Sequence, residues 1–181
     1  MKELSLHILD ILQNSVEAEA TKVDLLIEEN KDEGLLKIVI RDNGRGMGPE
    51  ELKKALDPFY TTRGTRRIGL GLPLFYELSK RCNGKFALKS SRGKGTSVEA
   101  TFELDHVDLP PMGDIAGTVL AFVIGNPGVD LKYVYRGNYG EFVMDTEELK
   151  RLLEVEELGD PVIVEALREK IKDTFSMISS F

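Results

Sequence analysis

The spacing of hydrophobic and polar positions predicts a series of short helices and strands in the first part of the chain. Apolar residues three or four positions apart indicate helices, whereas alternating apolar residues or short apolar runs indicate strands. We expect, in order, a helix at 4–20, strands at 21–29 and 35–42, helices at 49–56 and 69–84, and strands at 85–91 and 96–104. Pairs of strands that alternate with helices are typical of an α+β sandwich.

Residues 106–112 are predicted to link this first unit, 1–105, to a smaller C-terminal extension. They lie in the stretch DHVDLPPMGD, which has two prolines and alternating acidic residues. The extension, 113–181, begins with the apolar run IAGTVLAFVIGNP and continues with a predicted hairpin at 131–145 and two helices. Its 69 residues are few for an independent hydrophobic core. We therefore expect a small α+β extension that packs on the first unit.

The last predicted helix, 160–178, carries a continuous apolar stripe with two interpretations. The stripe is too long to remain in water. It could pack on the protein's own hairpin, or it could form a docking face for a partner or a second subunit, so that oligomers assemble through the extension. Its members are spaced 3, 4, 4 and 3 residues apart: Val164, Leu167, Ile171, Phe175 and Ile178.

Charge and cysteine content narrow the classes of function. The net charge of −7 argues against a nucleic-acid partner, which usually requires a basic surface. The one cysteine, Cys82, rules out a disulfide framework and favours a reducing compartment; we expect it to be a buried structural thiol. No run is apolar enough to span a membrane, and charged residues interrupt the first ten positions, so no signal peptide is predicted. We expect a cytoplasmic protein without a membrane partner.

Several common motifs are absent. The sequence lacks G-x-x-x-x-G-K-[ST], which excludes a P-loop nucleotide site. The stretch GLGLPL begins like G-x-G-x-x-G but has Leu74 at the third glycine. There is no cluster rich in histidine or cysteine that would indicate a metal site.

Four polar residues share one stripe of the first predicted helix. They are spaced 3, 4 and 3 residues apart, which confines them to a stripe about 80° wide. A solvated face of a surface helix would show the same pattern. An asparagine amide oxygen, however, is a suitable ligand for Mg²⁺, which shares its coordination shell with phosphates and water. The four residues are His7, Asp10, Asn14 and Glu17.

The stretch IRDNGRGMGPEEL, 40–52, combines a strand-terminal acid with closely spaced glycines. The carboxylate of Asp42 could accept a hydrogen bond from an exocyclic amine such as that of adenine. Gly44 and Gly46 have no side chains, so the main chain there could lie against a flat ring. The stretch therefore suggests a pocket for a nucleotide base.

Further along the chain, two glycines precede a predicted helix. The free N–H groups at such a helix start bind phosphate, which makes Gly69 and Gly71 candidates for phosphate contacts. Arg63 and two further arginines lie in the preceding loop and could neutralise phosphate charge. Thr96, at the start of the last predicted strand, could bridge to the base through its hydroxyl.

Taken in this order, the motifs resemble those of the GHKL superfamily of ATP-binding domains, which includes DNA gyrase, the ninety-kilodalton chaperones, sensor histidine kinases and MutL. The resemblance covers about residues 4–104. LDILQNSVEAEAT resembles the N box, DNGRGM the G1 box, DPFYTT the F box and GLGLPL the G2 box. The last two boxes are most similar to those of histidine kinases, whereas NSVEAEATKVDL is more similar to MutL.

The resemblance implies a fold, cofactors and roles for individual residues. The fold would be the Bergerat sandwich, a mixed sheet covered on one face by helices. ATP or ADP with Mg²⁺ would be the ligand, under a short lid at about 60–68. Asn14 would hold Mg²⁺ and Asp42 would bind adenine. The remaining contacts would come from Gly44 and Gly46 at the base, from Gly69, Leu70 and Gly71 at the phosphates, and from Arg63 and Thr96.

Asp10 is the candidate catalytic residue. In gyrase-like ATPases, and in serine kinases that act on anti-sigma partners, the corresponding position holds a glutamate general base. A carboxylate near the γ-phosphate can deprotonate a water or a hydroxyl, which typically contributes about 10²–10⁴ in rate. Aspartate is one methylene shorter, and Asp10 could instead be a helix-face acid paired with a neighbour such as Lys22.

The nucleotide motifs do not fix the reaction. Histidine kinases carry their acceptor histidine on a hairpin before the ATP-binding domain, and neither His7 nor His106 occupies such a place, so a self-contained sensor kinase is not expected. We expect a kinase that acts on, or an ATP-dependent regulator of, a separate protein; the alternatives are a slow ATPase switch and a binding-only nucleotide sensor. The whole chain also resembles small stand-alone ATP-binding proteins found near iron hydrogenase subunits of anaerobic bacteria, which would imply a link to a redox complex.

Overall fold

The computed structural model describes residues 3–57 and 70–179. Within these residues the chain forms an α+β fold, as expected. Its elements in order are α1 (Leu4–Glu17), β1 (Lys22–Asn30), β2 (Leu35–Asp42), α2 (Pro49–Lys54), α3 (Gly71–Arg81), β3 (Phe86–Ser91), β4 (Gly95–Glu103), α4 (Ile115–Gly125), β5 (Asp130–Gly137), β6 (Gly140–Asp145), α5 (Thr146–Leu153) and α6 (Pro161–Ile178).

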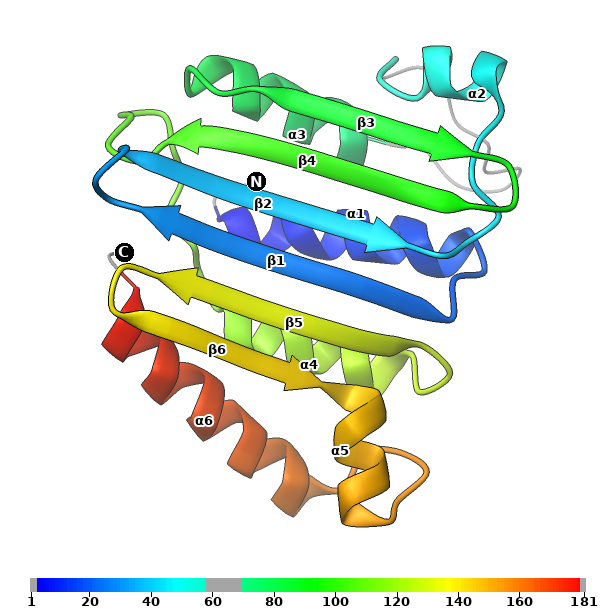
Figure 1. The fold of residues 1–181 in the computed structure, drawn as a ribbon, viewed down its shortest axis with the longest axis vertical. Helices are drawn as coiled ribbons and strands as arrows, with labels where there is room; N and C mark the ends of the chain where they lie inside the picture. The colour runs from blue at the N-terminus through cyan, green and yellow to red at the C-terminus, as the bar shows by residue number, and fades with distance from the viewer. Residues whose placement is uncertain (1–2, 58–69, 180–181) are drawn as a thin grey trace.

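All of these strands belong to one mixed sheet of order β3-β4-β2-β1-β5-β6 (Figure 1). Neighbouring strands are antiparallel except β1 and β5, which pair in parallel over residues 22–28 and 130–136. The C-terminal hairpin β5–β6 therefore does not stand beside the first four strands but extends their sheet. The sheet and its hydrogen bonds continue across the predicted boundary at residue 105.

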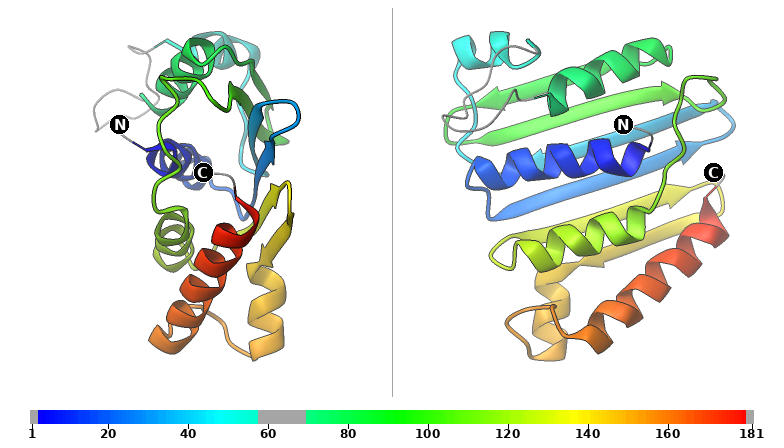
Figure 2. Two further views of the ribbon diagram at one scale, coloured as in Figure 1. Left: turned by 90° about the vertical axis from the view of Figure 1, so that its left-hand side faces the viewer. Right: turned by 180° about the vertical axis from the view of Figure 1, so that it is seen from behind.

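The long helices α1, α3, α4 and α6 cover one face of the sheet, and no described element covers the other (Figure 2). The short helices α2 and α5 lie at the β3 and β6 sides. The buried apolar residues form one cluster that includes Leu12 of α1, Phe75 of α3, Leu120 of α4 and Tyr133 of β5. Helices on one face of a mixed sheet match the predicted architecture. Cys82 is buried in this cluster, and burial raises the pKa of its thiol.

α1 ends earlier than the apolar pattern suggests, at Glu17 and not at residue 20. Glu19 has a left-handed backbone with φ 60°, and the N–H of Ala20 donates to the carbonyl of Ser15. A left-handed residue just after the last turn is a common way to end a helix, because its backbone bonds satisfy the last free carbonyls. The chain then turns directly into β1.

The predicted linker is packed against the start of α1. The N–H groups of Leu4 and Ser5 donate to the carbonyls of Pro111 and Met112, both at 2.9 Å. The first N–H groups of a helix have no partner within it. Residues 111–112 supply acceptors for two of them, so this segment holds α1 in place.

The apolar stripe of α6 packs on the protein's own sheet. Ile171 and Ile178 are buried, and Phe175 lies 5.0 Å from the ring of Tyr135 on β5. The apolar run that begins the extension forms the helix α4, which is buried on most of its sides. None of the helices within residues 3–57 and 70–179 is long and apolar enough to cross a membrane.

Candidate nucleotide-binding site

The carboxylate of Asp42 lies where β2, β4 and α1 meet. The antiparallel register places Asp42 opposite Thr96. Its Oδ1 accepts the N–H of Gly44 at 2.9 Å and the N–H of Thr96 at 3.2 Å, and its Oδ2 accepts the hydroxyl of Ser15 at 3.0 Å. A carboxylate oxygen accepts about two hydrogen bonds. Oδ1 is therefore fully used, and Oδ2 retains one position for a donor such as an amine.

The glycines after Asp42 allow the main chain to approach other parts of the protein. A Cβ at Gly44 would lie 2.6 Å from the carbonyl oxygen of Ala18. Gly46 has φ +64°, and a Cβ there would overlap the carbonyl of Ser91. The sequence suggested that the missing side chains make room for a ring. The structure shows that they first make room for the α1–β1 loop and β3; their contact with a base stays a prediction.

The backbone N–H of Thr96 donates to Asp42, and the Thr96 hydroxyl forms a hydrogen bond with the Ser90 hydroxyl. The two hydroxyl oxygens are 2.9 Å apart, and the Ser90 hydroxyl donates to the carbonyl of Gly95 at 3.0 Å. A serine hydroxyl has only one proton, so Thr96 is the donor in this pair. Its oxygen is left as an acceptor, and any bridge from Thr96 to a ligand would have to use it in that way.

α1 and α3 bring together two motifs that are far apart in the sequence. A Cβ at Gly71 would lie 3.2 Å from the Cβ of Asp10 and 3.6 Å from the Nδ2 of Asn14. Asp10 is exposed and Asn14 is half-buried. Leu70, the residue before α3, has no polar side chain with which to cap the first N–H groups of the helix. The candidate general base Asp10, the candidate metal ligand Asn14 and the candidate phosphate site at Gly71 therefore lie at one junction.

Some of the predicted contacts lie outside the described residues. These are Arg63, Gly69 and the predicted lid at 60–68, together with most of the DPFYTT motif. Their roles stay predictions.

His7 is not part of the site, although it shares the helix stripe with Asp10 and Asn14. Only 5% of its surface is exposed, and its ring stacks on Phe75 of α3 with centroids 6.0 Å apart. Burial, together with the nearby N-terminal charge, lowers the pKa of His7 to about 4. Residues of one stripe of α1, about 80° wide, thus lie both at the site and in the core, where His7 packs between α1 and α3.

Three residues that position the site were missed by the sequence interpretation. Two of them are Ser15, which donates to Asp42, and Ser90, which hydrogen-bonds with Thr96. Asn43 anchors the turn after β2, because its Oδ1 accepts the N–H groups of Thr21 and Lys22 at 2.9 Å each. Small polar residues are common, so no local signal separates these from surface residues. For Ser15 alone there was an indication in the sequence, because this residue lies on the apolar side of its helix next to Asn14.

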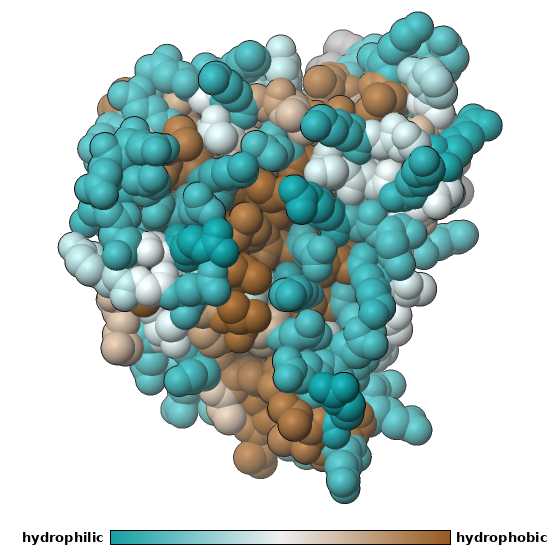
Figure 3. Space-filling model, in the orientation of Figure 1, coloured by the Kyte–Doolittle hydropathy of each residue, from teal (hydrophilic) through white to brown (hydrophobic). Residues whose placement is uncertain are grey.

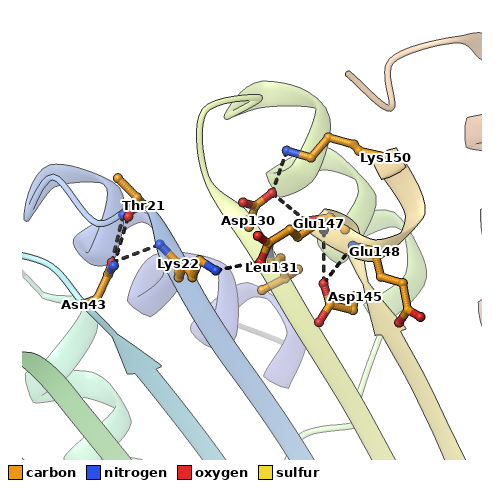
Figure 4. A network of polar contacts seen from close by, with 10 residues as sticks. Thr21, Lys22, Asn43, Asp130, Leu131, Asp145, Glu147, Glu148 and Lys150 are labelled. Carbon is orange, nitrogen blue, oxygen red and sulfur yellow. Dashed lines mark hydrogen bonds and ion pairs between the residues drawn. The ribbon is translucent and has the colours of Figure 1, made fainter. Parts of the chain in front are cut away.

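A polar network continues from Asn43 to α5, a helix of the C-terminal extension (Figure 4). Lys22 forms an ion pair of 2.6 Å with Glu147, which raises the pKa of Lys22 through a hydrogen bond and charge attraction. Lys150 pairs with Asp130 at 2.6 Å, and Asp145 caps the helix by accepting the N–H groups of its first turn. Surface contacts thus connect the turn after β2, which lies next to the site, to the C-terminal extension.

The donor set fits a magnesium ion that is held mainly by phosphates. Within residues 3–57 and 70–179, no group of three or more His, Cys, Asp or Glu side chains could hold a metal ion. The amide oxygen of Asn14 would supply one ligand, and Mg²⁺ commonly completes its shell with phosphate oxygens and water. Such an ion would enter with the nucleotide.

Similarity to solved structures extends over most of the chain. The ATPase domain of MutL from Aquifex aeolicus, complexed with ADP, superposes with a TM-score of 0.52 and 16% identity, covering 86% of this chain and 70% of that chain. The N-terminal domain of a DNA repair protein gives a TM-score of 0.55 and 16% identity, covering 80% and 53%. At this identity the likeness shows the fold alone, and its coverage includes part of the C-terminal extension.

Similarity to curated relatives extends over little more than half of the chain. Sensor histidine kinase YxdK of Bacillus subtilis is 33% identical over 106 residues, which are 56% of this chain and 33% of that protein. A putative sensor protein of Shewanella frigidimarina is 30% identical over 59% of this chain and 17% of its own length. The chain thus spans a third or less of these relatives. The family model that matches residues 2–106 describes histidine kinase-, DNA gyrase B- and HSP90-like ATPases, and this chain belongs to that family.

Proposed function

We propose that this protein binds ATP with Mg²⁺ and acts as a kinase on, or as an ATP-dependent regulator of, a separate protein. Membership in a family of ATPases supports ATP binding. Relatives named sensor histidine kinase and sporulation kinase support phosphoryl transfer. The observation that carries the proposal is the Asp42 carboxylate, which three donors hold in place with one acceptor position left for an amine.

The proposed roles follow the geometry of the junction. The adenine amine donates to Asp42 Oδ2, with the turn at Gly44 and Gly46 beside the base. The phosphates lie at the start of α3, near Leu70 and Gly71, where the first N–H groups of the helix, which the Leu70 side chain cannot cap, favour negative charge. Asn14 supplies an amide oxygen to Mg²⁺, whose charge offsets that of the phosphates.

Asp10 is the proposed general base. It lies beside Gly71, the first residue of α3, where the γ-phosphate would be held. The carboxylate would take a proton from the attacking hydroxyl as the new oxygen–phosphorus bond forms and ADP leaves. If the hydroxyl belongs to a partner protein, the reaction is that of a kinase. If it belongs to water, the protein is a slow ATPase switch, a second candidate that the exposure of Asp10 also allows.

Transfer of label from γ-labelled ATP distinguishes these reactions. Label on a co-purified protein indicates a kinase, label released as phosphate indicates an ATPase, and neither indicates a nucleotide sensor. Asp10→Asn should abolish either reaction while nucleotide affinity changes only a few-fold, because an amide cannot accept the proton. Asp32→Asn, in the β1–β2 turn, is the matched control. Turnover that survives in Asp10→Asn would remove the general-base role.

A further inference from the structure

The helix-free face of the sheet carries three parallel rows of side chains that cross four strands. The registers of β2–β1, β1–β5 and β5–β6 define these rows. The middle row is apolar throughout: Val39, Leu26, Val134 and Val143. On its two sides lie charged rows, again in the order β2, β1, β5, β6: Lys37, Glu28, Arg136 and Glu141; and Arg41, Asp24, Lys132 and Asp145.

The apolar row is visible as a band that runs down the open face of the molecule (Figure 3). Val39 is 4% exposed, yet it is not part of the core cluster beneath the helices, because it points to the opposite face. Val143, at the other end of the band, is 50% exposed. A continuous apolar band on a face that no described element covers is typical of an interaction surface.

The charged rows alternate in sign, as cross-strand pairing within one chain favours, and this alternation also makes them complementary to their own reversal. An axis parallel to the strands, between β1 and β5, exchanges β1 with β5 and β2 with β6. This exchange places every charge on an opposite charge and every apolar residue on an apolar residue. The charged pairs are Lys37 with Glu141, Glu28 with Arg136, Arg41 with Asp145, and Asp24 with Lys132.

We propose that a second copy of this chain packs on the open face about this two-fold axis. A symmetric dimer uses the same patch on both copies, so its surface must be complementary to itself. Two sheets pack face to face with their strands nearly aligned. In that arrangement Leu26 faces Val134 of the other copy, and the apolar band is covered along its whole length.

Charged side chains that form no ion pair with any described residue support this arrangement. Arg136 already pairs with Glu28 and Glu141, and these contacts would suit a solvated face equally well. By contrast, the described residues contain no ion pair that involves Asp24, Arg41 or Lys132. In the dimer all three of these side chains acquire a partner of opposite charge.

The distribution of charge over the whole molecule favours the same orientation. Residues 85–94, at the β3 side, include four basic and no acidic residues. Residues 145–160, at the β6 side, include seven acidic and two basic residues. Reversing the strand order brings the basic side of one copy over the acidic side of the other. Complementary potentials of this kind fix the orientation of an interface and speed its formation.

The strands that face one another cover enough area for a specific contact. With the axis between β1 and β5, four strands of each copy overlap; at about 4.8 Å apart, and with about eight residues of about 3.3 Å each, they span roughly 500 Å². The two copies together would bury about 1,000 Å², which is the lower end of the range for specific interfaces. The nucleotide-site residues lie at the helix side and at the strand ends, so nucleotide and the second copy need not compete.

Analytical ultracentrifugation with charge-swapped variants tests the proposal. The wild-type protein should be a dimer at micromolar concentration. Asp24→Lys places a lysine against Lys132 of the partner copy, and Lys132→Asp places an aspartate against Asp24 of the partner copy. Each variant alone should be mainly monomeric, with its dissociation constant raised about tenfold or more. Mixed in equal amounts, the two variants should form a heterodimer, because both of its cross-pairs again join opposite charges.

Mixing the two variants distinguishes an effect of contacts between chains from an effect of contacts within one chain. Asp24 and Lys132 are also neighbours in one sheet, but mixing cannot repair a repulsion inside either chain. Glu33→Lys, in the β1–β2 turn, makes the same charge change off the face and should remain dimeric. Circular dichroism and nucleotide binding check that each variant is folded. A wild-type monomer at about 100 μM, or single variants that stay dimeric, would overturn the proposal.

Discussion

At the scale of single residues, the site depends on how hydrogen bonds are shared among few atoms. The Asp42 carboxylate accepts from Ser15, Gly44 and Thr96 and has one position left. Because these donors fix both oxygens, the Asp42 side chain would lose little conformational freedom when a ligand binds to it. In the proposed site, the same contacts would let this strand-terminal acid, which would ordinarily be solvated, select one partner by its chemistry.

Replacing this acid should change the choice of base. Asp42→Asn keeps the shape but can present an amide donor where the carboxylate oxygen was. A hydrogen bond to a charged group contributes about 1.5–3 kcal/mol, so ATP affinity should fall by about ten- to a hundredfold. GTP carries a carbonyl oxygen at the equivalent position and should lose much less. Calorimetry with both nucleotides measures the difference, and Asp32→Asn is the control; equal losses would contradict the adenine assignment.

His7 should make the stability of the protein depend on pH. Its pKa is lowered by burial to about 4, whereas the unfolded chain titrates near 6.5. Below about pH 6.5 the unfolded state takes up a proton that the folded state does not, so stability falls as the pH drops from 6.5 to 4 and then levels off. The loss attributable to His7 should total roughly 3 kcal/mol.

His7→Phe, which retains an aromatic ring against Phe75, should remove this part of the pH dependence. Chemical denaturation at several values between pH 4 and 7 would measure it, as the difference in slope from the wild type. His106→Phe, in the segment before α4, is the matched control. A slope unchanged in His7→Phe would show that His7 titrates alike in the folded and unfolded states, which would contradict the lowered pKa.

At the scale of elements, tight turns decide how the helices approach the sheet. Gly84 follows α3, and a Cβ there would overlap the carbonyl of Thr101 on β4. The Ser79 hydroxyl lies within hydrogen-bond distance of the carbonyls of Lys85 and Thr101 across the same turn, and its single proton is shared between them. The start of α3 must lie beside Asp10 and Asn14, so its C-terminal anchor indirectly positions the proposed phosphate contacts.

Gly84→Ala should therefore destabilise the fold. The added methyl group has backbone atoms in its way, and overpacking of this kind typically costs about 1–3 kcal/mol. Gly128→Ala is a suitable control, because a Cβ there would meet nothing within 4 Å. Thermal unfolding of both variants would show a marked fall in Tm for the first and little change for the second. Equal melting temperatures would mean that the turn can move without cost.

At the scale of the whole molecule, the first 105 residues do not contain a complete sheet and core. β5 pairs with β1, α4 packs against α1, and residues 111–112 bind the start of α1. The likeness to the MutL ATPase domain covers 86% of the chain, which exceeds the part matched by the family model. We infer that the extension completes the fold and that the truncated unit would expose β1 as a new sheet edge.

A fragment ending at Asp105 should therefore aggregate or unfold without a cooperative transition. Its exposed edge strand would offer unpaired N–H and C=O groups next to apolar side chains, an arrangement that favours association. Co-expression with residues 106–181 should restore a soluble complex that binds nucleotide. Sedimentation and thermal melting test this expectation. A monodisperse fragment with a sharp transition would show that the first 105 residues fold independently.

The sequence by itself determined the types and order of most elements and the family. Apolar spacing is a local property, so strands such as β2 and helices such as α3 could be recognised within windows of about ten residues. The spaced motifs around Asn14, Asp42 and Gly71 likewise indicated a nucleotide site, because each combines residue types that few other functions require. The α+β fold and the family assignment are confirmed. The ligand contacts themselves stay predictions.

Only the tertiary structure decided which distant segments meet. Nothing near β1 in the sequence indicates that its neighbour is β5, more than a hundred residues away, because strand pairing depends on how the whole core packs. The burial of His7 and the contact of Ser15 with Asp42 were hidden for the same reason: one helix stripe can face the site at Asn14 and the core at His7. The self-complementary rows of the open face also became visible only once the strand order and register were known.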